Sequence, residues 1–288
     1  MLNSIKKGIK WSAIQQWVVA GMNISTTLIL SSKLNPEDFG IYTKATVLIS
    51  FLIIVQEMGI NSLIIKRKNL KSHEISAIRN FLIITSIVLF ILFFYLSKPI
   101  LNILFSGNSV VTYHLATVML ISILLENAFL IYRALLVKEM KFNILAKNNI
   151  IGHLSGNLSA LIFVKFFGIW VLPLKQILTL FVSGVLNWYG YNKKIKIVYK
   201  VYNIFLEKNY LIGLSFSQVL TYLTRNIDYI IIGRYLGPDL LGQYSIAYRI
   251  MMFPMKKFSD LIGRAIFPAL SIVSNDLKAI KEYYFETV

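Results

Sequence analysis

Cysteine is absent from this sequence, which excludes disulfides, thiolate zinc sites and cysteine nucleophiles. Histidine is scarce, and His73, His114 and His153 lack the spacing of zinc ligands. The chain has no glycine-rich phosphate loop ending in Lys-Ser or Lys-Thr and no nucleophile elbow. We therefore expect no metal, no cofactor and no enzymatic activity.

Charge is also sparse. Only 15% of the residues are charged and 56% are hydrophobic. In a soluble domain about 25% of the residues are charged and about 45–50% are apolar. The run "FLIITSIVLFILFFYLS" (81–97) approaches the roughly 20 apolar residues that cross a bilayer as a helix. The composition predicts an all-α polytopic membrane protein.

Apolar runs predict about eight transmembrane helices: one complete six-helix lobe plus the first two helices of a second lobe. We place them near 11–32, 41–65, 80–97, 110–137, 149–164, 169–190, 211–233 and 243–262.

The net charge of +17 is distributed unevenly. Most Lys and Arg residues lie before the first span, at 66–79, at 138–147, at 193–208 and after the eighth span. These are alternate connections, as the positive-inside rule requires, and they predict that both termini are cytoplasmic. Basic loops that meet anionic headgroups also explain the charge without nucleic acid.

One short loop occurs twice. "LNPEDFGIY" (34–42) is echoed by "LGPDLLGQY" (236–244), 202 residues later, and each joins two predicted spans. The matches are Leu34 with Leu236, Pro36 with Pro238, Gly40 with Gly242, Tyr42 with Tyr244, Ala45 with Ala247 and Gln16 with Gln218. The echo predicts an internal repeat, with a first lobe at 1–200 and the start of a second at 201–288. We expect the second lobe to be truncated.

Three segments carry a family resemblance. They are "KLNPEDFGIYTKATVLISFLIIVQEMGINSLIIKRKNL" (33–70), "NIDYIIIGRYLGPDLLGQYSIAYRIMMFP" (226–254) and "IFPALS" (266–271). They resemble the oligosaccharide-lipid flippases of polysaccharide biosynthesis, within the multidrug/oligosaccharidyl-lipid/polysaccharide exporter superfamily.

The resemblance implies two six-helix lobes around a central cavity in the bacterial cytoplasmic membrane. It implies alternating access that moves undecaprenyl-diphosphate-linked oligosaccharide between leaflets, commonly coupled to an ion gradient, beside other polysaccharide assembly proteins. A drug/cation antiporter of the same superfamily and an inactive fragment or scaffold are the alternatives.

A cavity for such a substrate needs cations for the diphosphate, and the seventh span offers a candidate. Arg225 and Asp228 lie three residues apart, on one helix face. Arg225 could bind phosphate while Asp228 orients it or couples an ion; alternatively, the two form a structural pair between helices.

Further ionisable residues lie within or beside other spans. Glu57 could take a proton, pair with a cation of a lobe, or lie at the cytoplasmic interface. Glu126 and Arg133, seven residues apart, could form an interior ion pair, unless Arg133 only reaches towards the headgroups.

The remaining candidates lie nearer the outer face or along the first span. Lys44 and Arg249, equivalent within three residues under the repeat, could receive the diphosphate or reach towards headgroups. Gln16, Asn23 and Gln218 could bind sugar hydroxyls, although polar residues also join helices to one another.

Overall fold

A computed structural model of the protein describes residues 2–57, 59–66, 71–192 and 208–252. Met1–Ser245 form one compact unit and Ile246–Val288 a second. The first unit holds α1 (Leu2–Ser31), α2 (Pro36–Glu57), α3 (Ile60–Lys66), α4 (Ser72–Leu104), α5 (Val110–Met119), α6 (Ile121–Lys138), α7 (Phe142–Phe167), the 3₁₀ turn η1 (Gly168–Trp170), α8 (Val171–Tyr191) and α9 (Lys208–Tyr235). Residues 237–252 are helical as well.

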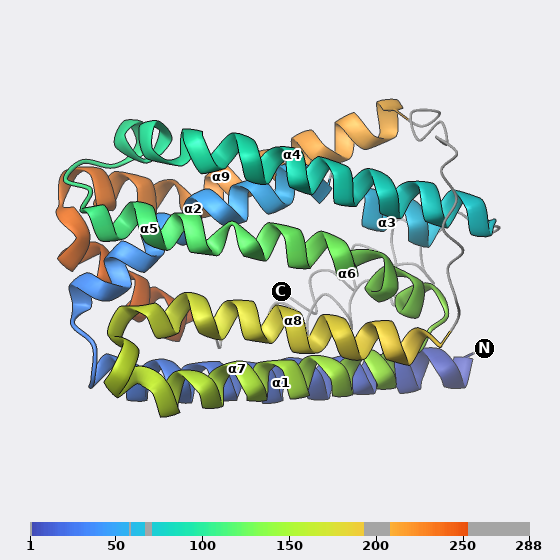
Figure 1. The fold of residues 1–288 in the computed structure, drawn as a ribbon. Coiled ribbons are helices and arrows are strands. Elements are labelled where there is room, and N and C mark those ends of the chain that lie inside the picture. Colours follow the sequence, from blue (N-terminus) through green and yellow to red (C-terminus); the bar gives the residue numbers. More distant parts are fainter. Residues whose placement is uncertain (1, 58, 67–70, 193–207, 253–288) are drawn as a thin grey trace, which may run out of the picture. The chain divides into compact units, whose positions relative to one another are not determined.

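The long helices run back and forth between two ends of the first unit (Figure 1). The N-terminus, α3 and the last turns of α6 and α8 lie at one end, which we call the basic end. The connections α1–α2, α4–α5 and α7–α8 lie at the other, which we call the loop end. The basic connections predicted from the sequence therefore begin and end on a single side of the bundle.

The structure confirms the all-α membrane architecture. Among the described residues, four helical segments are long and apolar enough to cross a bilayer: Pro36–Glu57, Ser72–Leu104, Val110–Lys138 and Phe142–Tyr191, the last of which contains both α7 and α8. Helices α1 and α9 cover the predicted first and seventh spans, and their insertion stays a prediction. Residues 253–262 of the predicted eighth span lie outside the described residues.

The predicted second span, 41–65, is corrected to two helices. Helix α2 ends at Glu57 and α3 begins at Ile60, and Gly59 between them has a φ of +68°. This left-handed conformation suits glycine and interrupts an α-helix. The interruption leaves Glu57 at the C-terminal end of α2.

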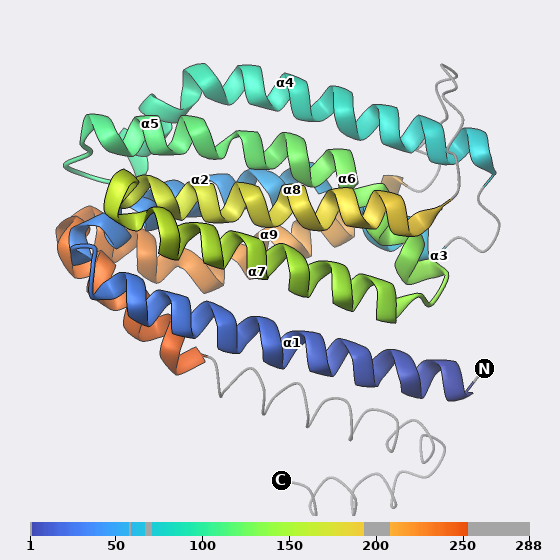
Figure 2. The ribbon, with the colours of Figure 1, turned by 60° about the horizontal axis from the view of Figure 1, so that its bottom comes forward.

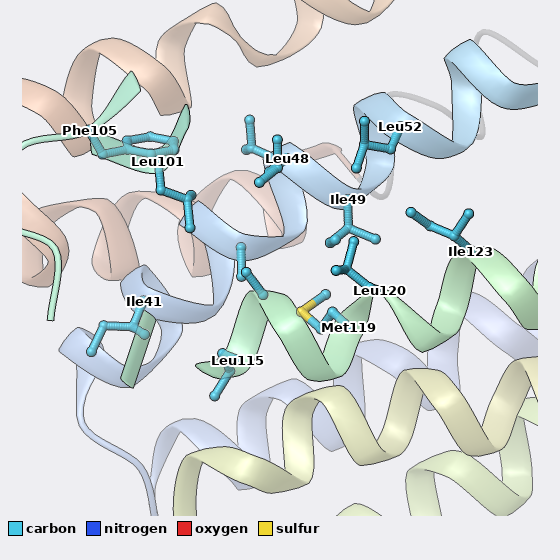
Figure 3. Close-up of a cluster of buried hydrophobic side chains, with 13 residues drawn as sticks. Ile41, Leu48, Ile49, Leu52, Leu101, Phe105, Leu115, Met119, Leu120 and Ile123 are labelled. Atoms are coloured by element: carbon cyan, nitrogen blue, oxygen red, sulfur yellow. The ribbon is translucent and has the colours of Figure 1, made fainter. Parts of the chain in front are cut away.

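Two clusters of buried apolar side chains fill the interior around α2, α4 and α6. Figure 3 shows the first, where α2, the end of α4, α5 and the start of α6 meet. The second joins α3, the start of α4 and the rest of α6 towards the basic end. The first cluster includes Leu52 and Ile123, and the second includes Ile60 and Leu130. Glu57 and Glu126 therefore lie in the chain between the two clusters.

Helices α7 and α8 pack at close range through small residues. Gly152, Gly156 and Ala160 are buried and four residues apart on α7. A Cβ atom on Gly152 would lie 2.9 Å from the Thr179 carbonyl oxygen of α8. At Gly156 it would overlap the Thr179 hydroxyl and lie 2.5 Å from the Lys175 carbonyl oxygen. Small residues at this spacing allow close backbone approach between membrane helices.

Gly156→Ala is expected to destabilise the bundle. The new methyl group must displace backbone or the Thr179 side chain, and such overpacking costs about 1–3 kcal/mol. The matched control is Gly21→Ala on α1, where an added Cβ meets nothing within 4 Å and where alanine should gain about 0.5–1 kcal/mol. Thermal melting in detergent measures both, and equal melting temperatures would contradict the packing argument.

Candidate functional site

A partly buried charged pair lies on α6. The Arg133 guanidinium contacts the Glu126 carboxylate at 2.6 Å, and the two side chains are 34% and 14% exposed. Two helical turns separate them, so both project from one face of α6. The structure contains the predicted ion pair, and its place in the interior of the membrane stays a prediction.

Glu57 joins this pair from the end of α2. Its carboxylate hydrogen-bonds to the Asn61 side chain and is close enough to Arg133 and Glu126 to interact electrostatically with both. The neighbouring Gln56 is 2% exposed and donates to the Leu82 carbonyl oxygen of α4 at 3.3 Å. Glu57 thus lies near the Glu126–Arg133 pair, and we call Glu57, Glu126 and Arg133 the charged cluster.

Arg225 and Asp228 of α9 do not pair with each other in this structure. Asp228 accepts a hydrogen bond from the Tyr244 hydroxyl at 2.7 Å and another from the Tyr229 backbone N–H at 2.9 Å. The Arg225 side chain is exposed and makes no ion pair or hydrogen bond within the part of the chain that the structure describes. Arg225 is therefore available for an external ligand.

Lys44 lies in a different environment from the one the sequence suggests. It is 1% exposed, and its ammonium donates to the Ser106 carbonyl oxygen at 2.9 Å and to Asn108 Oδ1 at 3.4 Å. It also lies 5.6 Å from the centre of the Phe105 ring. Lys44 thus neither reaches towards headgroups nor faces an open space; it joins α2 to the α4–α5 connection. Arg249, half-buried, belongs to the second unit.

The three polar candidates Gln16, Asn23 and Gln218 are half-buried. Asn23 on α1 accepts a hydrogen bond from Asn157 of α7 at 3.3 Å, so it joins two helices, as the second alternative proposed. Gln218 on α9 has a buried Oε1 without a partner among the described residues. The sequence argument about sugar hydroxyls stays a prediction.

Several polar contacts between helices had no sequence signal. The Tyr222 hydroxyl of α9 donates to the Val47 carbonyl oxygen of α2 at 2.5 Å. Asn148 and Asn187 join α7 to α8 at 3.0 Å. Tyr42 donates to Gln176 of α8 at 3.0 Å; this tyrosine does stand in the repeated loop, and its position there could have drawn attention to it.

The described residues hold no group of three His, Asp or Glu side chains that could bind a metal ion. What they do hold is a partly buried charged cluster on helices that are long and apolar enough to cross a bilayer. Interior charges of this kind are costly and are typical of membrane proteins that move a substrate or an ion. The fold and the apolar helices together define a polytopic helical membrane protein with a charged cluster among its helices.

Comparison with known proteins gives the family. The family model described as "Polysaccharide biosynthesis protein" matches residues 29–288, and the chain belongs to this family.

Three named relatives also match this chain. The chain is 27% identical to the teichuronic acid biosynthesis protein TuaB of Bacillus subtilis, over 96% of this chain and 58% of that protein. It is 24% identical to the lipopolysaccharide biosynthesis protein WzxC of Escherichia coli, over 97% and 57%. It is 22% identical to the succinoglycan biosynthesis transport protein ExoT of Rhizobium meliloti, over 95% and 55%. The chain thus spans a little over half the length of these relatives.

A solved structure has the same fold. The lipid II flippase MurJ, in an inward closed conformation, superposes with a TM-score of 0.69 at 19% identity, over 97% of this chain and 61% of that one. The chain therefore shares the fold of a part of that structure.

The Glu126–Arg133 pair gives a test of stability. Arg133→Ala should destabilise the protein by about 1–3 kcal/mol, because it leaves Glu126 enclosed without its cation. The same change in a Glu126→Gln background should cost much less, since glutamine is neutral, has nearly the same shape and does not need the cation. A double-mutant cycle from unfolding in detergent measures the coupling. Additive effects would contradict an energetic pair.

Proposed function

We propose that this protein moves undecaprenyl-diphosphate-linked oligosaccharide across the bacterial cytoplasmic membrane by alternating access. Support comes from family membership across residues 29–288, from a relative described as a transport protein and from a fold shared with a lipid II flippase. The proposal assigns no catalytic step to the protein.

The observation that carries the proposal is the charged cluster of Glu57, Glu126 and Arg133. An ion pair inside an apolar bundle is expensive, and pure packing would be served by apolar side chains. Among the described residues, Glu126 pairs with Arg133 and Glu57 lies near the same arginine, so this group of three carries one net negative charge. That charge suits a transiently bound proton or sodium ion, which would link the cluster to ion-coupled transport.

The diphosphate requires a cation that is free to bind it. Arg225 meets this requirement, since its guanidinium is exposed and without a partner among the described residues. Arginine binds phosphate oxygens through two parallel N–H donors. Gln218, seven residues earlier on the same helix, has a buried amide oxygen to offer a sugar hydroxyl. We assign the diphosphate to Arg225 and a supporting polar contact to Gln218.

Orientation follows from the basic end. Helix ends flanking the lysine-rich connections gather there (Figure 1), and lysine and arginine favour the cytoplasmic side. We infer that the N-terminus is cytoplasmic and that the loop end faces outwards. Other proteins of polysaccharide assembly could then contact the basic end from the cytoplasm or the loop end from outside.

The alternative of a drug/cation antiporter is favoured by the same surplus carboxylate, which could bind a cationic drug directly. An inactive scaffold would need neither Arg225 nor the cluster. Binding discriminates among the three. The chain, purified in detergent, is titrated with undecaprenyl-diphosphate-linked oligosaccharide, with phosphatidylglycerol as an anionic control lipid and with a lipophilic cation. Saturable binding of the first alone supports the flippase, and binding of the cation alone supports the antiporter.

Arg225→Gln should weaken binding of the lipid-linked oligosaccharide about tenfold. The loss of one charge-assisted hydrogen bond corresponds to about 1.5–3 kcal/mol, and each 1.4 kcal/mol is about tenfold in affinity. The matched control is Lys165→Gln at the end of α7, another exposed cation, which should leave the affinity unchanged. An unchanged affinity in Arg225→Gln would remove this residue from the site.

A further inference from the structure

The two copies of the repeated loop touch each other. A Cβ atom added to Gly40 would overlap the Pro238 carbonyl oxygen, and one added to Gly242 would overlap the Pro36 carbonyl oxygen. Position 238 is the repeat equivalent of position 36, and position 242 of position 40. The same contact therefore occurs twice with the roles exchanged, as in an isologous interface. We call these four residues the loop crossing.

The loop crossing is a contact between two backbones. Each glycine lies four residues after its proline, so both belong to the first turns of a helix, and only hydrogen atoms separate each glycine Cα from the opposite carbonyl. Approach this close is possible only for glycine, and it favours weak Cα–H···O contacts. In Figures 1 and 2 the orange start of the helix after α9 lies beside the blue start of α2.

Buried residues lie directly beneath the crossing. Thr43 and Ser245, again 202 residues apart, follow their glycines by three positions and are 3% and 0% exposed. A helical residue three positions on lies on the same face, one turn deeper. Leu241, beside Gly242, is 0% exposed. The crossing thus lies next to a layer of buried residues.

Contacts further along α2 and α9 differ in kind. Near the middle, the Tyr222 hydroxyl donates to Val47 and the Phe51 and Tyr222 rings lie 5.9 Å apart. Towards the basic end, the Leu214 side chain covers Gly59. These contacts are made by side chains, which can change rotamer as helices shift. The loop crossing has no side chain that could yield, so it is either closed or parted.

We infer that the loop crossing is a self-complementary closure of the bundle at the loop end, and that it opens as one unit. Because each glycine faces the other copy, bulk at either position must separate both contacts at once. In transport, separation of the two loops would open the interior of the bundle to the outer side of the membrane; that step rests on the proposed function. The closure itself does not, since it is a property of the two loops.

The absence of native cysteine allows a direct test. Thr43→Cys and Ser245→Cys, each the only thiol, report water access beneath the crossing in nanodiscs through reaction with a membrane-impermeant maleimide. Both should react slowly in the parent. Gly40→Ala and Gly242→Ala should each raise the rate at least tenfold at both reporters, and the double variant should add little. Gly21→Ala and Gly213→Ala, where an added Cβ meets nothing within 4 Å, are the matched controls.

Several outcomes would overturn the inference. One is labelling that stays slow in folded Gly40→Ala and Gly242→Ala; another is an increase at only one reporter, or effects that add in the double variant. If both variants fail to accumulate in membranes while Gly21→Ala accumulates normally, the crossing serves folding and not closure. No substrate enters this experiment, so it can fail while lipid-linked oligosaccharide still binds, and it can succeed if binding is absent.

Discussion

Helices in a bilayer gain little by burying apolar side chains against each other, because lipid tails are equally apolar. Close backbone approach and polar contacts must hold them together instead. Both occur throughout this protein: Gly152 and Gly156 let α7 reach the backbone of α8, and Asn148 adds a hydrogen bond to Asn187 between the same helices. The apolar clusters then fill the space that these contacts define.

The charged cluster depends on this frame. Glu57 ends α2, where the helix dipole disfavours a negative charge, and α2 has no basic residue in its last turn. The compensation comes from other helices, through Arg133 of α6 and Asn61 of α3. The left-handed Gly59 lies between Glu57 and α3, whose Asn61 hydrogen-bonds to the carboxylate. The Glu57 carboxylate at the end of α2 thus depends both on Asn61, which follows the break in the helix, and on Arg133 of α6.

Much of this could be predicted from the sequence, and the rest could not, for a physical reason. Apolar length and basic loops predicted the helices, and a spacing of seven predicted that Glu126 and Arg133 share a face. Lys44 donates to the Ser106 backbone carbonyl and to the Asn108 side chain. These acceptors are distant in the chain, so the sequence pattern does not reveal that they meet Lys44. The Tyr222–Val47 contact is hidden similarly. The repeat predicted that two loops are alike, but likeness does not say that they touch.

The two loops also show which features of a repeat are kept. In the first, the Asp38 side chain accepts from the Asn35 backbone N–H at 3.0 Å, and Pro36 begins the helix, where its missing N–H costs nothing. In the second, Gly237 with a φ of +86° replaces Asn35, and Leu240 stands where Asp38 would be. The helix starts therefore differ in their capping. The proline carbonyl and the glycine four residues later are present in both, and these are the groups that meet. The repeat therefore retains the residues that form the contact. Each loop supplies both a glycine and a proline carbonyl, so a larger residue at either glycine would disturb both halves of the contact.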